Sequence, residues 1–326
     1  MPLDACRRKV SAFALTRPAE AAHDRAMQAS AERAPREHAG VERLVSTFGD
    51  RMVRFAEERL GEELDARMNR IVTRTNEAGV DPFGFDPKVA RYALAVSAFL
   101  HRFYFRTEVF GIDRVPDGRV LVIANHSGQV PIDGLLLGTS LMLDTDRPRF
   151  PRAMVERWSA ELPFVSVLFP RCGQVIGSPD NARRLLEQDE ALIVFPEGSR
   201  GISKTFDRRY QLTDFGLGFM RLALETDTPI VPVAIVGGEE QYPSLADLKP
   251  LANVLGMPAF PILPQVFVGM LMPLPTRYRI HFGEPMTFHG DPDDDDAVIE
   301  TKVAAVKTTI QTMLQRGLRE RRSVWF

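Results

Sequence analysis

Apolar residues occur in three uninterrupted runs in the middle of the chain, at residues 120–124, 191–195 and 230–236. Each run is short and rich in Val, Ile or Leu, which is typical of a strand buried on both faces of a parallel sheet. Between these runs, residues 181–187 and 213–224 have the apolar spacing of amphipathic helices. Strands that alternate with helices predict an α/β domain with a mainly parallel sheet flanked by helices.

The chain before these runs is expected to form an amphipathic helical region over residues 41–110. From Val41 to Val72 the large apolar residues recur mostly every three or four positions, which predicts one helix or two. Turn residues then separate this part from a largely apolar helix at residues 89–105. Such helices are typical both of a lipid surface and of a cap on a core, so contact with lipid stays open.

Residues 1–40 are poor in large apolar groups and are expected to form a poorly ordered leader. Residues 111–326 are expected to form the α/β domain, which closes with a helix around residues 299–314. Inside this domain, residues 251–275 carry no charge, but five prolines argue against a membrane-spanning helix. We interpret that segment either as part of the core or as a segment that dips into one leaflet of a membrane.

Composition excludes several classes of function. The 326 residues carry 41 Lys and Arg against 43 Asp and Glu, so no overall basic field points to nucleic acid. The two cysteines, Cys6 and Cys172, are too few for a disulfide framework or a cysteine-based zinc site. The apolar run at residues 10–15 is too short for the core of a secretion signal, so we expect the protein on the cytoplasmic side.

Polar loops follow the first two apolar runs, where ligands collect in parallel α/β sheets. The first loop carries His126 and Asp133. A neutral imidazole removes a proton near neutral pH, and a carboxylate on its other nitrogen fixes the tautomer and stabilises the imidazolium. The second loop, Pro-Glu-Gly-Ser-Arg-Gly, supplies four candidate binding residues: Glu197, Gly198, Ser199 and Arg200.

These two loops, with the Ile-Val-Pro-Val run at residues 230–233, resemble the ordered motif blocks of the glycerolipid acyltransferases, the lysophosphatidic acid acyltransferase superfamily. The resemblance covers about residues 100–290. It implies that His126 is the general base on an acceptor hydroxyl and that Asp133 orients it. It also implies that residues 231–233 shape the acyl or acceptor pocket. The acceptor glycerol or its phosphate would be held by Glu197, Gly198, Ser199 and Arg200.

The resemblance implies direct transfer of a fatty acyl group from acyl-CoA or an acyl carrier protein to a lysolipid such as lysophosphatidate. The thioester is then a co-substrate, and neither a cofactor nor a metal is expected. A mono- or diacylglycerol acceptor stays open. The enzyme would work as a peripheral or monotopic protein on the cytoplasmic face of the cell membrane, where four arginines and Trp325 in the tail at residues 316–326 suit anionic lipid.

The chain departs from the common form of the family in two places. Six residues separate His126 from Asp133, where the common form has four. The block Gly-x-x-Phe-Ile-x-Arg of the common form reads Gly-Gln-Val-Ile-Gly here, and Arg171 precedes it instead of following it. The residue that would bind a phosphate is therefore undefined, and the acceptor headgroup with it.

Other classes of function explain less of the chain. A lipid hydrolase would need a Gly-x-Ser-x-Gly nucleophile elbow, which does not occur. His126 and Asp133 also lack the helical spacing of a zinc-protease motif. A lipid-binding scaffold would account for residues 251–275 but would leave the two polar loops unexplained.

Overall fold

The computed structural model describes residues 50–71, 75–77, 79–158, 162–254, 259–267 and 272–325. The predicted leader and the start of the predicted helical region lie outside these residues. The residues from Met52 onward belong to one compact unit. A helix over residues 50–70 precedes the sheet, which confirms an N-terminal helix in the predicted helical region, although residues 108–110 of that region form a strand of the sheet.

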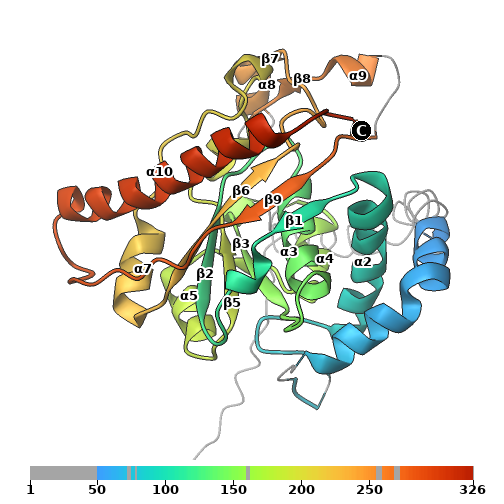
Figure 1. The fold of residues 1–326 in the computed structure, drawn as a ribbon, viewed down its shortest axis with the longest axis horizontal. Coiled ribbons are helices and arrows are strands. Elements are labelled where there is room, and N and C mark those ends of the chain that lie inside the picture. Colours follow the sequence, from blue (N-terminus) through green and yellow to red (C-terminus); the bar gives the residue numbers. More distant parts are fainter. Residues whose placement is uncertain are drawn as a thin grey trace, which may run out of the picture. The chain divides into compact units, whose positions relative to one another are not determined.

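A seven-stranded sheet forms the centre of this unit, in the order β1-β9-β6-β2-β5-β3-β4 (Figure 1). All neighbouring strands are parallel except β6 and β9, so the mainly parallel sheet predicted from the sequence is confirmed. The strands are β1 (Glu108–Phe110), β2 (Val120–Ala124), β3 (Pro151–Val155), β4 (Val175–Ile176), β5 (Ala191–Val194), β6 (Ile230–Val236) and β9 (Arg279–Phe282).

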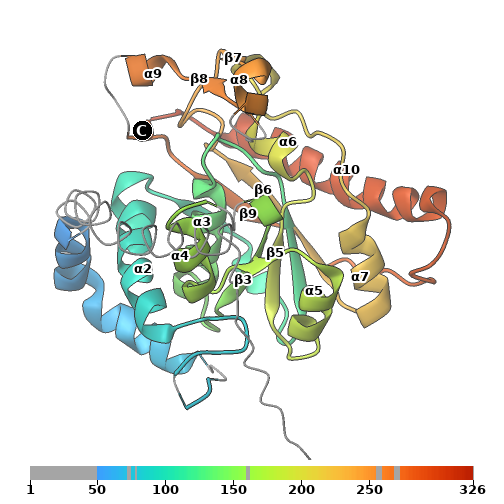
Figure 2. The ribbon, with the colours of Figure 1, turned by 180° about the vertical axis from the view of Figure 1, so that it is seen from behind.

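Helices cover both faces of the sheet (Figures 1 and 2). One face packs on α5, α7 and α10, and the other packs on α3. The helix over residues 50–70 packs on α2 and on the end of α3. The helices are α2 (Pro87–Phe99, continued by a π-helix at Leu100–Tyr104), α3 (Ile132–Leu143), α4 (Val165–Arg171), α5 (Pro179–Leu186), α6 (Ser199–Ile202), α7 (Gly218–Thr226) and α10 (Asp296–Glu320).

The uniformly apolar sequence of β2 follows from its place in the middle of the sheet. Val120 and Val122 point into the core under α3, whereas Leu121 and Ile123 point into the core under α5, α7 and α10. All four side chains are fully buried. A strand with a core on each side has no face for polar residues, which is why the run was visible in the sequence.

The register of the central strands places the two polar loops at one edge of the sheet. Ile123 of β2 pairs with Val194 of β5, so the two strands end at the same level. On the other side of β2, Ala124 pairs with Val233 of β6. The loops after β2 and β5 therefore leave the sheet side by side, as expected for parallel neighbours.

The helix predicted at residues 213–224 begins later than expected. Helix α7 starts at Gly218, and tertiary hydrogen bonds hold the preceding residues in another conformation. The backbone and side chain of Thr213 donate to Glu197, and the Gly216 backbone donates to the carbonyl of Pro196 at 2.9 Å. These bonds compete with helix formation and are invisible to a periodicity argument.

The uncharged segment at residues 251–275 forms short elements instead of one helix. Together with the residues just before it, the segment contains a two-stranded sheet and two short helices. These are β7 (Ala246–Asp247), α8 (Lys249–Val254), β8 (Pro261–Ile262) and α9 (Pro264–Phe267). Among the described residues, none of the helices combines the length and apolarity needed to cross a bilayer.

The central position of β2 gives a first prediction. Replacing Leu121 with Ala leaves a cavity in the core under α10, and we expect the free energy of unfolding to fall by about 3 kcal/mol. Chemical denaturation measures this loss. Val298→Ala, at a side chain that is 45% exposed, is the control and should change stability by less than about 0.5 kcal/mol. Equal effects of the two changes would contradict the placement of β2.

Candidate active site

His126 and Asp133 meet at the end of β2. The His126 Nδ1 atom lies 2.7 Å from Oδ2 of Asp133. The Asp133 side chain is fully buried in the first turn of α3, whereas 12% of the His126 side chain is exposed. The sequence therefore paired the right residues, although the loop between them is longer than in the common form of the family.

Three donors surround the carboxylate of Asp133. Besides the imidazole, it accepts the backbone N–H of Ser127 and that of Gly134, each at 2.8 Å. Since an ionised carboxylate only accepts hydrogen bonds, Nδ1 of His126 is the donor in this pair, and Nε2 is the imidazole nitrogen that keeps a lone pair.

Packing fixes the plane of the His126 ring. The ring stacks on Phe195 with centroids 4.1 Å apart and planes 20° apart. On the other loop, a Cβ atom added to Gly201 would lie 2.8 Å from the His126 Cβ, so only glycine allows α6 to approach this closely. The imidazole is held between the two loops before any substrate binds.

The long loop between His126 and Asp133 closes through two left-handed residues. Gly128 has φ of 90° and Gln129 has φ of 63°. Gln241, just after β6, donates from Nε2 to the carbonyls of Gly128 and Val130 at 3.0 and 3.1 Å. These two bonds satisfy carbonyl groups of the longer loop and hold it in place. They explain how the two extra residues are accommodated.

Glu197 lies elsewhere than the motif resemblance implied. Its side chain is fully buried, and both carboxylate oxygens accept hydrogen bonds from the protein itself. One oxygen accepts the backbone N–H of His126 at 3.0 Å, and the other accepts the N–H and hydroxyl of Thr213 at 2.8 and 3.0 Å. In this structure Glu197 positions the base and does not face an acceptor.

A buried lysine supports Glu197. Lys204 Nζ lies 2.9 Å from Glu239 and 3.6 Å from Glu197. Burial by itself lowers the pKa of Lys204, but the two carboxylates outweigh it, so the pKa lies above its ordinary value. Burial raises the pKa of Glu239 to about 7, against the opposing effect of Lys204. Lys204 therefore stays charged and balances the carboxylates behind the histidine loop.

The remaining motif residues form the corner before α6. Gly198 has φ of 59° and ψ of −149°, a conformation suited to glycine. The Ser199 backbone donates to Oε1 of Glu156 at 2.6 Å. Arg200 is exposed, and one of its five guanidinium donors reaches the carbonyl of Asp214 at 3.0 Å. Among the four candidate binding residues, Arg200 is therefore the one whose charged side chain is exposed to solvent.

The block at residues 231–233 lies inside β6. Val231 and Val233 are fully buried in the core under α3, and the backbone carbonyl of Pro232 accepts the N–H of Gly283 at 2.8 Å. The resemblance implied that this block shapes a substrate pocket. In this structure the two valine side chains instead pack β6 beside β2.

Sequence reasoning missed three residues that complete the site. Gln241 closes the histidine loop, Lys204 balances Glu197, and Glu156 accepts from Ser199. They come from three separate segments, and no motif spacing links them. The only available signal for Glu156 was its position directly after β3, at the same sheet edge as the two polar loops.

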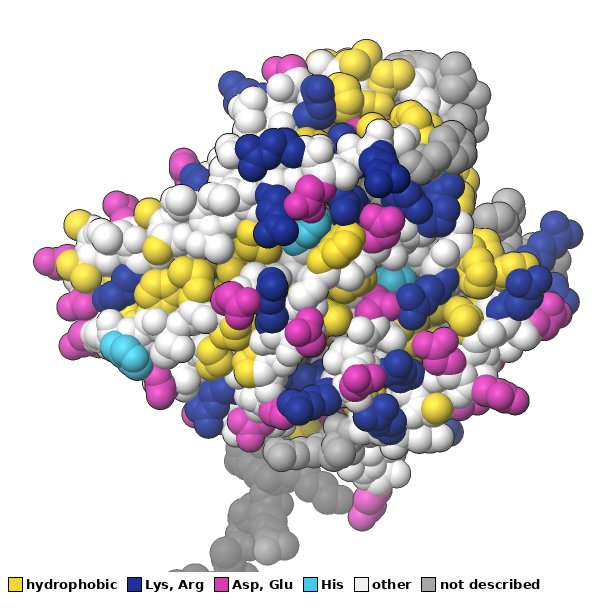
Figure 3. All heavy atoms as spheres, viewed as in Figure 1, with side chains coloured by type: hydrophobic (Ala, Val, Ile, Leu, Met, Phe, Trp, Pro, Cys, Tyr) yellow, Lys and Arg dark blue, Asp and Glu magenta, His cyan; other side chains and the backbone are white. Residues whose placement is uncertain are grey.

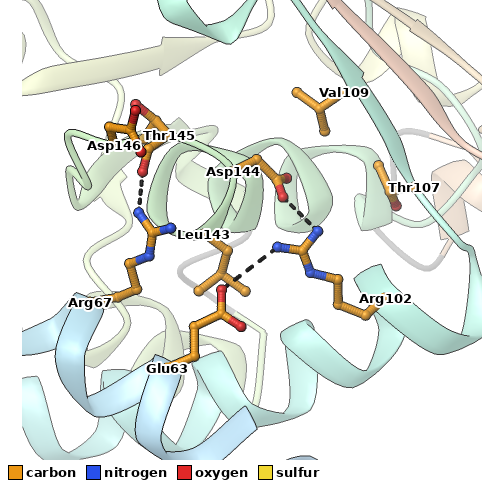
Figure 4. Close-up of a pocket in the computed structure, with 9 residues that line it drawn as sticks. All are labelled: Glu63, Arg67, Arg102, Thr107, Val109, Leu143, Asp144, Thr145 and Asp146. Atoms are coloured by element: carbon orange, nitrogen blue, oxygen red, sulfur yellow. Dashed lines mark hydrogen bonds and ion pairs between the residues drawn. The ribbon is translucent and has the colours of Figure 1, made fainter.

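A polar cavity of about 390 Å³ lies at the opposite end of α3 from Asp133 (Figure 4). Arg102 pairs there with Asp144 at 2.8 Å and with Glu63 at 3.8 Å, and Arg67 donates to the carbonyl of Thr145. Arg102 is ion-paired and Arg67 is bonded to a backbone carbonyl, so we assign this cavity no part in the reaction. Among the residues that the structure describes, no group of His, Cys, Asp or Glu is arranged to hold a metal ion.

Known proteins are similar to this chain over the part that carries these loops. A family model described as Acyltransferase matches residues 106–236. An uncharacterized protein of Mycobacterium tuberculosis is 39% identical over 263 residues, which cover 77% of this chain and 73% of the relative. The human protein described as DGAT1/2-independent enzyme synthesizing storage lipids is 22% identical over 214 residues, which cover 65% of this chain and 62% of that protein.

Among solved structures, the crystal structure of the 1-acyl-sn-glycerophosphate (LPA) acyltransferase from Thermotoga maritima aligns with a TM-score of 0.47 and 16% identity. The alignment covers 86% of this chain and 99% of that one. From the family model and the mycobacterial relative, the chain belongs to the acyltransferase family. The resemblance to acyltransferases stated from the motifs is thereby confirmed at the level of the family.

The bonds of Glu197 give a prediction that separates positioning from binding. Glu197→Gln puts an amide N–H against backbone donors, and we expect the free energy of unfolding to fall by about 3 kcal/mol. We expect kcat to fall while KM for the acceptor stays within about twofold. Steady-state kinetics and chemical denaturation measure these values.

The matched control is Glu187→Gln on the exposed end of α5, which should leave stability and kinetics unchanged. A large rise in KM for the acceptor with little loss of stability would show that Glu197 contacts the acceptor directly.

Proposed function

We propose that this acyltransferase moves a fatty acyl group from acyl-CoA or an acyl carrier protein to a free hydroxyl of a lysolipid, with His126 as general base. The observation that carries the proposal is the 2.7 Å bond from His126 to the buried Asp133, which leaves Nε2 for the substrate. The motif resemblance makes lysophosphatidate the first acceptor to test. As in the sequence analysis, we propose that the protein works peripherally on the cytoplasmic face of the membrane.

The chemistry is a direct transfer. Nε2 of His126 removes the proton from the acceptor hydroxyl while the hydroxyl oxygen attacks the thioester carbonyl. The tetrahedral intermediate collapses, the carbon–sulfur bond breaks, and the thiolate leaves with the proton that the imidazolium returns. Asp133 stabilises the imidazolium in between. The reaction needs no acyl-enzyme, which agrees with the lack of a nucleophile elbow in the sequence.

Glu156 favours a second candidate, an acceptor without a phosphate, such as mono- or diacylglycerol. Its carboxylate lies on the Gly198–Ser199 corner, the part of the motif that the resemblance assigns to the acceptor. The second oxygen of Glu156 accepts the indole N–H of Trp158 at 2.8 Å. A carboxylate at this corner repels a phosphate dianion. The name of the human relative, which refers to storage lipids, supports the same candidate.

The general base is tested by His126→Ala. Because no other group replaces the proton acceptor, we expect ester formation from acyl-CoA and an acylglycerol acceptor to fall by about 10²- to 10⁴-fold. Release of CoA thiol that depends on the added acceptor measures this rate. His289→Ala, at an exposed histidine, is the control and should keep full activity. Near-normal turnover by a folded His126→Ala protein would refute the assignment.

The acceptor class is tested by Glu156→Gln. The amide keeps an oxygen for the Ser199 N–H but removes the charge, so we expect kcat/KM for lysophosphatidate to rise about tenfold relative to monoacylglycerol. Preference of the wild type for monoacylglycerol, reduced in Glu156→Gln, would favour this second candidate over lysophosphatidate. Glu187→Gln controls for the loss of one negative charge elsewhere. Preference of the wild type for lysophosphatidate, with no change in Glu156→Gln, would favour the phosphate-bearing acceptor instead.

A further inference from the structure

The chain between β6 and β9, residues 237–278, carries an unusual concentration of exposed apolar side chains. We propose that this surface, called here the apolar face, docks the protein on a lipid bilayer that contains anionic lipid. Figure 3 shows apolar side chains gathered over β7, α8 and β8, with Lys and Arg side chains nearby. The apolar face consists of Leu245, Leu248, Leu251, Val254, Val266 and Met272.

The polarity of this segment is inverted relative to an ordinary surface. Gln241 and Gln265 are buried, and Gln265 donates to the carbonyls of Gln241 and Met272 at 3.3 and 3.2 Å. Meanwhile Leu245 is 66% exposed and Val254 is 82% exposed. Polar groups thus hold the segment together from inside while apolar groups face outward. Water penalises that arrangement, and the apolar zone of a bilayer favours it.

Helix α8 shows the same orientation within a single element. Leu251 and Val254 are three residues apart, so they lie on one side of the helix, and both are exposed. Ala252, between them, is buried at 2% exposure and packs inward. The helix therefore presents its larger apolar side chains outward and its small one to the protein, which suits insertion between lipid headgroups better than burial in the fold.

Basic side chains lie beside the apolar face and favour anionic lipid over other occupants. A cleft of about 180 Å³ is lined by four arginines, with two carboxylates and a serine: Arg277, Arg279, Arg321, Arg322, Glu108, Glu320 and Ser323. Arg277 and Arg279 share Glu108, and Arg321 pairs with Glu240, so among the described residues Arg322 is the arginine of this cleft whose charge is left for an anionic headgroup. Arg106 connects this cleft to the end of the apolar segment, because it donates to the carbonyls of Pro275 and Trp325 at 2.7 and 2.8 Å. Trp325 is 39% exposed, and its amphipathic ring suits the bilayer interface.

The same segment is bonded to the catalytic loop. Gln241, which supports residues 128 and 130, receives the N–H of Leu274 on its carbonyl at 2.9 Å and the hydroxyl of Tyr278 on its amide oxygen at 2.8 Å. Beyond α6, the Phe206 backbone donates to the carbonyl of Ser244 at 2.8 Å. A bilayer on the apolar face would therefore lie next to the loop that carries His126.

Vesicle flotation of the full chain tests the proposal. We expect the wild type to float with vesicles of phosphatidylcholine and phosphatidylglycerol, and less with phosphatidylcholine alone. The double variant Leu245→Asp, Val254→Asp should bind at least about tenfold more weakly, because two charges enter the headgroup boundary at positions that do not support the fold. Val298→Asp on α10, a 45% exposed site, is the matched control and should float as the wild type does.

The basic cleft is tested by Arg322→Glu, which should weaken binding to anionic vesicles and leave the weaker binding to neutral ones unchanged. Flotation of the double variant at the wild-type level, or absence of flotation by the wild type, would overturn the proposal. So would loss of acyl carrier protein binding in the double variant with unchanged flotation, since the surface would then belong to that protein partner.

The expectation that the acceptor reaches His126 from the apolar face rests on the proposed function. The expected flotation result does not depend on the proposed function. In the double variant we expect acyl transfer to an acceptor embedded in vesicles to fall about tenfold, while transfer to a water-dispersed short-chain acceptor stays at the wild-type rate. Failure of the proposed function would appear as His126→Ala without effect on either acceptor. Failure of the docking proposal would appear as equal activity of wild type and double variant on vesicles.

Discussion

The site depends on one buried carboxylate, Asp133, which binds the imidazole of His126 and two backbone donors at once. Three hydrogen bonds hold this carboxylate in a fully buried position, and because an ionised carboxylate only accepts, the bond to His126 uses the proton on Nδ1. The rest of the site serves this bond. Glu197 accepts a hydrogen bond from the backbone of His126. Lys204 balances the negative charges of Glu197 and Glu239.

The sheet supplies the frame for that arrangement. Parallel pairing of β2 with β5 and β6 brings three segments that are distant in the sequence to one edge, where each contributes a different part. The loop after β2 carries His126, the loop after β5 holds the backbone of His126 through Glu197, and Gln241 after β6 closes the longer turn. The residues of the candidate site thus lie on loops, and the buried strands beneath them determine where these loops start.

In the described part of the segment between β6 and β9, several apolar side chains are exposed and several polar side chains are buried, which is the reverse of the usual arrangement. Between β6 and β9, Gln241 and Gln265 lie inside, whereas Leu245, Leu248 and Val254 lie outside, near an arginine-lined cleft. If the proposed docking and the proposed acceptor are correct, the acceptor reaches His126 without leaving the bilayer. Gln241 would then connect the docking surface with the loop of His126, because it is bonded to both.

The sequence by itself determined the parallel sheet, its core and the pairing of His126 with Asp133. Buried strands need uniformly apolar runs, and the residues that follow such runs must meet at one sheet edge. It did not determine the start of α7, the hydrogen bonds of Glu197 or the outward orientation of Leu245, Leu248, Leu251, Val254, Val266 and Met272. Those depend on hydrogen bonds between segments far apart in the chain, such as Thr213 with Glu197, and on which side of an apolar segment the fold leaves uncovered. Tertiary structure alone decides both, because local periodicity carries no record of distant partners.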